Sequence, residues 1–173
     1  MRIVLLAATL LLASCASAPN PSLACPAERA IYTLRGEPGA TLRILQTPHP
    51  LNAYSELAAR VDFEGETYWF AFVSSLGYSR NYIGRTDDPF EAARREDAAE
   101  DNGEIPPPPE YDGSELTTFD AAYNVLPNVP QRGDPAPAHL LATGVGSSIW
   151  YSIPRRALPK ALWDLTSCAD VQS

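Results

Sequence analysis

Side chains that could carry out chemistry are scarce in this chain of 173 residues. The two histidines, His49 and His139, each stand beside proline-rich sequence, without an H-E-x-x-H motif or another spacing typical of metal ligands. The segment 144–148 does not match the G-x-S-x-G motif of serine hydrolases. A glycosidase needs two carboxylates, but with 21 acidic residues that signal has no specificity. The sequence therefore predicts no catalytic residue, metal ligand or cofactor, and favours a noncatalytic protein over an enzyme.

One short segment is a candidate binding loop. It follows an aromatic run at residues 67–73 and joins polar to aromatic side chains. Its members are Tyr78, Arg80, Asn81 and Tyr82. Loops carry binding residues more often than regular elements do, although the same residue types also occur in ordinary surface loops. The segment is therefore a hypothesis for a ligand contact, and an ordinary loop is the alternative.

The amino-terminal residues have the pattern of an export signal. Met1 and Arg2 provide a short positive start, and residues 3–12 form an apolar run interrupted only by Thr9. Ten residues rise about 15 Å as a helix, roughly half the hydrocarbon thickness that a spanning helix must cross. The run therefore has the length of a signal peptide and is too short for a transmembrane helix.

The four residues Leu12, Ala13, Ser14 and Cys15 resemble the lipobox of the bacterial lipoprotein family, which has Leu, two small residues and an invariant Cys. The resemblance covers residues 1–15 alone. It implies cleavage between Ser14 and Cys15, a diacylglyceryl group on the Cys15 thiol, and a further acyl chain such as palmitate on the new amino group. The alternative is an ordinary secretory signal that is cut at an A-x-A-like site, for which Ala13 or residues 16–18 could serve.

The same resemblance implies a partner and a location. Two or three acyl chains on Cys15 hold a protein on a bilayer, whereas a single chain binds only reversibly. Ala16 stands where the inner-membrane retention signal of enterobacterial lipoproteins has Asp. We therefore expect a lipid-anchored protein of the cell envelope, sorted to the outer membrane and facing the periplasm.

Two further cysteines remain once Cys15 is assigned to lipid. Cys25 and Cys168 would meet an oxidising compartment after export, and we expect them to form a disulfide. Closing so long a loop stabilises a domain by roughly 5 kcal/mol in the chain-entropy model. A redox-active pair is the alternative, but the C-x-x-C spacing is missing. Residues 16–24 consist mainly of small residues and two prolines, and predict a tether with a reach of at most about 30 Å.

The charge and length define the remaining organisation. We expect a signal peptide at 1–14, an anchor and tether at 15–24, one disulfide-closed β-rich domain at 25–168, and a polar tail at 169–173. The full chain has a net charge of −8, and loss of Arg2 with the signal leaves 12 basic and 21 acidic residues, a charge of −9. An acidic protein of this size is not expected to bind nucleic acid or anionic lipid.

An acidic, proline-rich spacer is expected at about residues 94–114. Asp88 and Pro89 before it have the pattern of a helix start, and this helix should end near Asn102. The prolines at 106–109 then favour an extended left-handed conformation, as a spacer or as a docking ligand. Residues 101–104 resemble part of a calcium loop but lack the alternating ligands of an EF-hand. We expect this segment to be exposed and mobile.

Strand patterns occur before the spacer. Residues 31–34 and 41–45 flank a turn sequence and predict a hairpin. Residues 57–63 alternate apolar and polar side chains, which indicates a strand with one buried face. The run at 67–73 is apolar on both faces, as in a central strand buried on two sides. That run could instead line a ligand groove.

The pattern weakens after the spacer. We expect a strand within 116–125, a strand at 147–153 equivalent to 65–70, and a short helix that begins at Pro159 and places Trp163 against the core. A small basic cluster precedes that helix; its members are Arg155, Arg156 and Lys160. This cluster would suit a phosphate or a membrane surface, or simply be the solvated start of a helix.

These elements predict a mainly β fold: an antiparallel sheet, either a sandwich or a partly open barrel, with two short helices. An α+β fold is the alternative. The functional hypothesis is a noncatalytic interaction or structural module that faces the periplasm and contacts another envelope protein or a glycan. The alternative is a small-molecule or glycan-binding protein, or an enzyme, with a site among exposed aromatic side chains.

Overall fold

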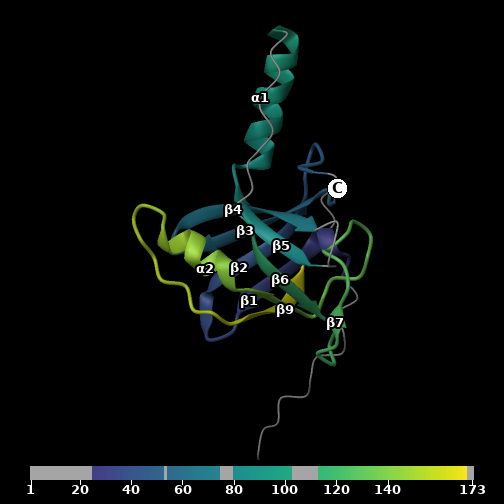
Figure 1. The fold of residues 1–173 in the computed structure, drawn as a ribbon, viewed down its shortest axis with the longest axis vertical. Coiled ribbons are helices and arrows are strands. Elements are labelled where there is room, and N and C mark those ends of the chain that lie inside the picture. Colours follow the sequence, from purple (N-terminus) through teal and green to yellow (C-terminus); the bar gives the residue numbers. More distant parts are fainter. Residues whose placement is uncertain (1–24, 53, 75–79, 103–112, 171–173) are drawn as a thin grey trace, which may run out of the picture.

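The structure is a computed structural model that describes residues 25–52, 54–74, 80–102 and 113–170. Within these ranges the chain forms nine strands, two α-helices and one short 3-10 helix (Figure 1). The strands are β1 (Ala30–Leu34), β2 (Glu37–Gln46), β3 (Leu57–Phe63), β4 (Glu66–Ser74), β5 (Asn81–Thr86), β6 (Gly113–Phe119), β7 (Val125–Leu126), β8 (His139–Ala142) and β9 (Leu162–Cys168). The helices are η1 (Ala27–Arg29), α1 (Pro89–Asn102) and α2 (Thr143–Trp150).

Eight of the strands form a closed antiparallel barrel. Hydrogen-bonded neighbours follow the order β1, β2, β3, β4, β5, β6, β8 and β9, and β9 pairs with β1 to complete the ring. The pairing of β5 with β6 joins two edges that would otherwise remain open to other chains. This confirms the mainly β, antiparallel fold with two helices. Of the two expected forms, sandwich or partly open barrel, the protein adopts a barrel, and the barrel is closed.

The amino-terminal strands form as the sequence predicts. Tight turns at Gly36 and Gly65 connect β1 to β2 and β3 to β4, with φ of +81° and +80°. Only glycine adopts this left-handed backbone conformation without steric cost, so a glycine at each of these two positions favours the turn. In β3, Leu57, Ala59 and Val61 are completely buried, which confirms the expected buried face.

Aromatic side chains fill the barrel interior. Tyr32, Phe70, Phe72 and Trp163 are each at most 1% exposed. An eight-stranded barrel is just wide enough for side chains to fill it, so these rings occupy the space that a wider barrel could offer to a ligand. The inward face of the strand at 67–73 is therefore core, as its pattern indicated. The expected burial on both faces is wrong, because on the outward face Thr67 is exposed and Val73 is half-buried. The outward side chain of Trp69 is also half-buried.

Helix α1 begins where the sequence predicts. The carboxylate of Asp88 accepts hydrogen bonds from the backbone N–H groups of Phe90 at 2.8 Å and Glu91 at 3.3 Å, which satisfies donors that a helix start leaves free. Phe90 packs against Trp69 with 5.7 Å between ring centroids. Beyond this contact α1 projects away from the barrel (Figure 1). Residues 103–112, with the four prolines of the expected spacer, lie outside the described residues.

The expected strand at 147–153 is wrong, because residues 143–150 form helix α2. Val145 and Ile149 are the buried residues of this helix, and their i, i+4 spacing places them on one helical face. The glycines before them serve this packing: a Cβ on Gly144 would lie 1.7 Å from Ser114 Oγ. The proposed equivalence of residues 65–70 and 146–151 therefore fails, since one segment is strand and the other is helix.

The expected carboxy-terminal helix is also wrong. Residues 162–168 form β9, which lies between β1 and β8 and closes the barrel. Trp163 is 1% exposed, so its predicted burial against the core is confirmed. Proline at the first position favours a helix only weakly, whereas β9 gains backbone hydrogen bonds from β8 at residues 162–164 and from β1 at residues 163–168. The closure of the barrel therefore decides the conformation.

Candidate functional site

The disulfide between Cys25 and Cys168 is present. It joins residues 143 positions apart, with 5.7 Å between the two Cα atoms. The predicted meeting of the two ends of the domain is confirmed, because Ala30 at the start of β1 pairs with Cys168 at the end of β9. The element that lies beside β1 and carries Trp163 is a strand, however, where we expected a helix.

A proline-rich segment between β7 and β8, residues 127–138, crosses one end of the barrel; we call it the strap. Four of its backbone carbonyls accept hydrogen bonds from side chains of the barrel and its loops. The donors are Asn81 Nδ2 to Pro127 O at 3.1 Å, Thr118 Oγ1 to Asn128 O at 3.3 Å, Ser55 Oγ to Pro130 O at 3.0 Å, and Tyr32 Oη to Pro137 O at 2.9 Å. Burial raises the pKa of Tyr32, so its hydroxyl remains a donor.

Backbone hydrogen bonds tie the strap to the chain next to the disulfide. Ala136 N–H donates to Cys25 O at 2.7 Å, and Ala27 N–H donates to Asp134 O at 2.9 Å. On the other side, Leu165 N–H of β9 donates to Ala138 O at 2.9 Å. The strap is therefore held along its length by the barrel wall and by the disulfide-linked end of β1.

A groove of about 520 Å³ lies between the strap and the barrel wall. It is lined by Asp120, Ala121, residues 126–131, residues 134–138 and Leu165. Four of these fourteen residues are prolines, which have no N–H to donate. The lining is therefore mainly apolar and poor in hydrogen-bond donors. Its volume lies in the range of small-ligand pockets.

Two carboxylates give the groove a negative charge. Asp120 accepts hydrogen bonds from Ala122 N–H at 2.8 Å and from Asn124 N–H and Nδ2 at 2.9 Å and 2.8 Å. The bonds from Asn124 lower the pKa of Asp120 and favour its charged form. Among the described residues, none donates a hydrogen bond to the side chain of Asp134. No lysine or arginine belongs to the groove lining, so a bound cation would meet only negative charge there.

A network of four polar side chains lies beside the groove, on the outside of β1, β8 and β9. His139 Nδ1 lies 2.6 Å from Asp164 Oδ1, and Arg35 donates to both oxygens of Asp164 at 2.9 Å and 2.8 Å. Tyr123 stacks on His139 with 4.3 Å between ring centroids, and its hydroxyl accepts a hydrogen bond from Arg35 at 3.0 Å. The network joins the groove through Ala138 and Leu165, the chain neighbours of His139 and Asp164.

The electrostatics of this network favour a charged Asp164. Desolvation acts to raise the pKa of Asp164, but the hydrogen bonds from Arg35 and then His139 outweigh it and lower that pKa. The hydrogen bonds that Arg35 donates to Asp164 also raise the pKa of Arg35. Because the carboxylate of Asp164 contacts Nδ1 of His139, Nε2 is the ring nitrogen that could act as a base or as a metal ligand. Among the described residues, no serine or cysteine makes a hydrogen bond with His139.

A second feature lies where α2 ends. Residues 150–155, which we call the apolar loop, include three large side chains that are strongly exposed: Trp150 at 44%, Tyr151 at 79% and Ile153 at 98%. Arg155 lies over the ring of Trp150, 5.8 Å from its centroid. Residues 150–160 include three basic residues and no acidic one, so this part of an acidic protein is basic.

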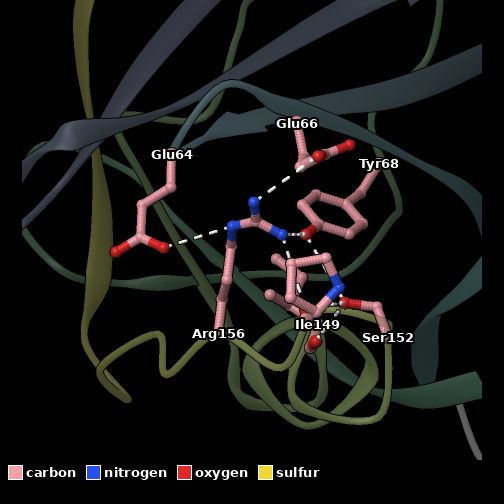
Figure 2. Close-up of polar contacts among 7 residues, drawn as sticks. Glu64, Glu66, Tyr68, Ile149, Ser152 and Arg156 are labelled. Atoms are coloured by element: carbon pink, nitrogen blue, oxygen red, sulfur yellow. Dashed lines mark hydrogen bonds and ion pairs between the residues drawn. The ribbon is translucent and has the colours of Figure 1, made fainter.

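Arg156 holds the apolar loop against the barrel, as Figure 2 shows. Its side chain, 13% exposed, forms ion pairs with Glu64 at 3.2 Å and Glu66 at 3.4 Å, both at the turn between β3 and β4. Within the loop, Ser152 Oγ donates to Ile149 O at 2.6 Å. The exposed side chains are therefore presented from a backbone that is tied down on both sides.

The structure describes some of the predicted site residues and not others. Tyr78, Ser14 and Cys15 lie outside the described residues. Asn81 and Tyr82 are the first residues of β5 and so belong to a strand, and Arg80 precedes it as an exposed residue. Asn81 is 6% exposed and holds the strap through Pro127. The basic cluster at 155–160 precedes β9, where we expected a helix.

Sequence reasoning missed the groove and the His139 network. His139 and Asp164 are 25 positions apart, and they meet because β8 pairs with β9 at this register. The prolines at 127, 130, 135 and 137 were the one visible signal of the strap. Proline cannot continue a strand ladder, so a run of prolines between strands indicates a loop with its own tertiary contacts.

Comparison with known proteins gives no relative: no family model, no curated sequence and no solved structure matches the chain. In the described part of the chain, no helix is both long and apolar enough to cross a bilayer. Within the same ranges, no three His, Cys, Asp or Glu side chains are grouped to hold a metal ion.

Proposed function

We propose that this chain is a lipid-anchored lipoprotein of the bacterial envelope and that its barrel is a noncatalytic binding module with the groove as its binding site. The lipobox at 12–15 supports the anchor, and a disulfide is typical of proteins that fold in an oxidising compartment. The groove is the observation that carries the second part. It is a preformed apolar space outside a filled barrel, and two carboxylates line it.

The chemistry of the groove selects a class of ligand. The four prolines of its wall have no N–H group to donate to a ligand. A ligand therefore gains little by offering acceptors. It gains apolar contact with the strap and an ion pair with Asp120 or Asp134. The groove thus suits an apolar segment that ends in, or carries, a cationic group.

The anchor places the groove near the membrane. The strap is bonded to Cys25, the residue at which the tether of residues 16–24 meets the domain. With a tether of at most about 30 Å, the groove would stay close to the bilayer surface. We expect this chain to be sorted to the periplasmic face of the outer membrane. From there the groove could reach an apolar and basic part of another envelope protein.

The anchor is tested with Cys15→Ser. Without the thiol no diacylglyceryl group can attach, so the variant should leave the membrane fraction or accumulate as uncleaved precursor. Fractionation of cells detects loss from the membrane, and a mass measurement of the amino terminus detects uncleaved precursor. A wild-type terminus that carries no lipid, at Ser17 or Pro19, would contradict the lipoprotein proposal.

The groove is tested with octylammonium, an apolar chain with one positive charge. NMR titration of the unlipidated full chain should shift the amides of the strap and Leu165, and Asp134→Asn should weaken binding several-fold. Nonanoate has the same eight-carbon alkyl chain with the opposite charge and is the matched control, which should bind more weakly than octylammonium. Equal binding of both ligands, or shifts outside the groove, would refute the charge argument.

A second candidate function follows from the His139 network. A histidine held by a carboxylate on Nδ1 is an arrangement used for general bases, and the exposed ring of Tyr123 stacks on it. We therefore keep a hydrolytic or glycan-modifying enzyme as the alternative. A screen with chromogenic esters and glycosides, compared between wild type and His139→Gln, decides between the two. An activity that His139→Gln abolishes, with octylammonium binding unchanged, would favour the enzyme.

A further inference from the structure

We propose that the groove of one copy takes the apolar loop of a second copy, so that the protein associates head to tail. This inference rests on the proposed role of the groove and names its occupant. The two surfaces differ in charge. The groove lining carries two aspartates and no basic residue, whereas residues 150–160 carry three basic residues and no acidic one.

The charges are concentrated in these two places. Residues 116–173 contain four acidic and four basic residues. Two of the four acids, Asp120 and Asp134, line the groove, and three of the four basic residues lie in or just after the apolar loop. The two surfaces therefore attract each other within a chain whose net charge of −8 makes it repel its copies elsewhere.

The two surfaces lie on different sides of the barrel. Figure 1 shows α2 and the loop that follows it on the left, and β7 with the strap on the right, with the barrel between them. One molecule therefore does not place its own loop in its own groove. A contact between two different surfaces is heterologous, and it builds rows or rings of copies rather than a closed symmetric pair.

The chemistry of the two surfaces matches in detail. Ile153, 98% exposed, supplies the apolar group, and Pro154 beside it needs no acceptor because it lacks an N–H. Arg155 brings a guanidinium with five N–H donors, which a donor-poor groove with two carboxylates can accept. Among the described residues, none donates a hydrogen bond to the side chain of Asp134, so its pairing with Arg155 of a second copy breaks no bond that this carboxylate makes within those residues.

Both surfaces are formed before they meet. Arg156 fixes the loop to Glu64 and Glu66, and backbone bonds fix the strap to Cys25 and β9. Preorganisation lowers the entropy that is lost on association. The contact is small, so it should be weak in solution. Anchored copies share one membrane surface, which raises their effective concentration and favours rows that lie parallel to the bilayer.

The test exchanges charges between two variants, Arg155→Asp and Asp134→Arg, both made in the unlipidated full chain that carries Cys15→Ser. With the native residues at both surfaces, that chain should show concentration-dependent sedimentation at hundreds of micromolar. Each variant alone should remain monomeric, because Arg155→Asp gives the loop the same negative sign as the groove, and Asp134→Arg leaves the groove with one arginine and one aspartate and so without net charge to attract Arg155.

Mixing the two variants restores the attraction. The aspartate introduced into the loop of the first variant meets the arginine introduced into the groove of the second. The unchanged Arg155 of the second variant likewise meets the unchanged Asp134 of the first. The mixture should therefore associate again, at least tenfold more tightly than either variant alone.

Two charge controls and one apolar variant complete the test. Arg94→Asp on α1 and Asp87→Lys before α1 make the same kinds of charge change at exposed positions outside both surfaces and should leave association unchanged. Ile153→Asp should abolish it. For anchored protein, energy transfer between labelled copies on vesicles should follow the same pattern.

Two results would overturn the inference: a monomer both in solution and on vesicles, or an association that Asp134→Arg leaves intact. If the protein is monomeric but octylammonium still binds in a manner that depends on Asp134, only the identity of the occupant is wrong. If octylammonium fails to bind as well, the proposed role of the groove is wrong too.

Discussion

The groove and the apolar loop are held in place by different kinds of bond. The strap that forms the groove is fixed by its own backbone, through carbonyls bonded to Tyr32, Ser55 and Asn81 and through amides near the disulfide. The apolar loop is fixed mainly by one charged side chain, Arg156, between two glutamates. Neutral backbone bonds respond little to salt and pH, whereas exposed ion pairs respond to both. The groove should therefore withstand conditions that release the loop.

The largest expected effect comes from removing the disulfide. Cys25→Ala with Cys168→Ala frees a loop that spans a separation of 143 residues, and the chain-entropy model gives a loss of roughly 5 kcal/mol as an upper value. The fold should persist, because the buried aromatic core does not depend on the bridge. Calorimetry should show a lower thermal midpoint.

The same variant also sharpens the comparison. The strap is bonded to Cys25 O, so octylammonium binding should weaken, while the apolar loop at the other side should keep its protection from proteases. Equal loss at both surfaces would show that the groove and the loop belong to one cooperative unit. Two free thiols in protein purified from the envelope would remove the basis of the prediction.

The next largest effect concerns the support of the apolar loop. A Cβ on Gly144 would lie 1.7 Å from Ser114 Oγ and 2.1 Å from Ser114 Cβ. Gly144→Ala should therefore push α2 away from β6 and destabilise the protein by about 1–3 kcal/mol, the usual cost of overpacking. Urea unfolding measures the change.

Two variants control for this effect. Ser114→Gly removes both clashing atoms and should restore most of the stability of Gly144→Ala. Gly39→Ala adds the same methyl group in β2, where the nearest atom is the flexible Glu37 Oε1 at 3.3 Å, and should change stability less. If Gly144→Ala and Gly39→Ala were equally mild, the close contact of α2 with β6 would not limit this position.

A smaller effect follows from releasing the loop itself. Arg156→Met keeps most of the side-chain length but loses the ion pairs with Glu64 and Glu66, and should cost about 1 kcal/mol, as for partly exposed pairs. Limited proteolysis should then cut after Tyr151 or Arg155. Octylammonium binding should remain, because no groove bond involves Arg156.

Arg156→Lys is the conservative control. It keeps one positive charge but lacks the planar fork that reaches two carboxylates at once, so its protease resistance should lie between those of wild type and Arg156→Met. An Arg156→Met protein with unchanged loop protection would show that Ser152 and the packing of α2 suffice to hold the loop.

The sequence predicted the first half of the barrel better than the second. The hairpins around Gly36 and Gly65 and the helix start at Asp88 depend on local turn and cap chemistry, which the residues themselves display. The segments 147–153 and 162–168 depend on tertiary pairing. The first has strand-forming residues but packs as a helix because glycines allow close approach, and the second becomes a strand because the barrel needs it to close.

The candidate site was visible only in part. The cysteine pair and the exposed basic residues could be identified from residue types, whereas the groove arises from backbone bonds that have no side-chain signature. The stacking of Tyr123 on His139, and the meeting of His139 with Asp164, require the register of β8 against β9. Long-range register in a barrel is fixed by closure, which local patterns do not contain.

The smallest expected effect is a pH dependence at the network beside the groove. The pKa of Asp164 is lowered in the folded protein, so the stabilisation by Arg35 is complete above the unfolded value of about 3.9 and is lost as the pH falls through the lower folded value. Asp164 and Arg35 have 30% and 49% of their side-chain surface exposed, and screening limits the effect to the order of 0.5 kcal/mol.

Acid should therefore loosen the turn that carries Tyr123 before it unfolds the barrel. Hydrogen exchange between about pH 5 and pH 2, a range that spans the carboxylate titration and is corrected for intrinsic rates, should show early loss of protection at Tyr123 N–H and persistent protection at Ala136 N–H, whose acceptor is a neutral carbonyl. Asp164→Asn should reduce the pH dependence at Tyr123, and the part that remains should come from Asp120, whose carboxylate has a lowered pKa and accepts backbone hydrogen bonds within the same turn. Asp62→Asn, which removes a similar pair with Arg60 on β3, should leave the pH dependence unchanged. Parallel loss of protection at both amides would mean that the strap shares the charge dependence of its surroundings, and the claim that neutral backbone bonds hold the groove independently of charge would fail.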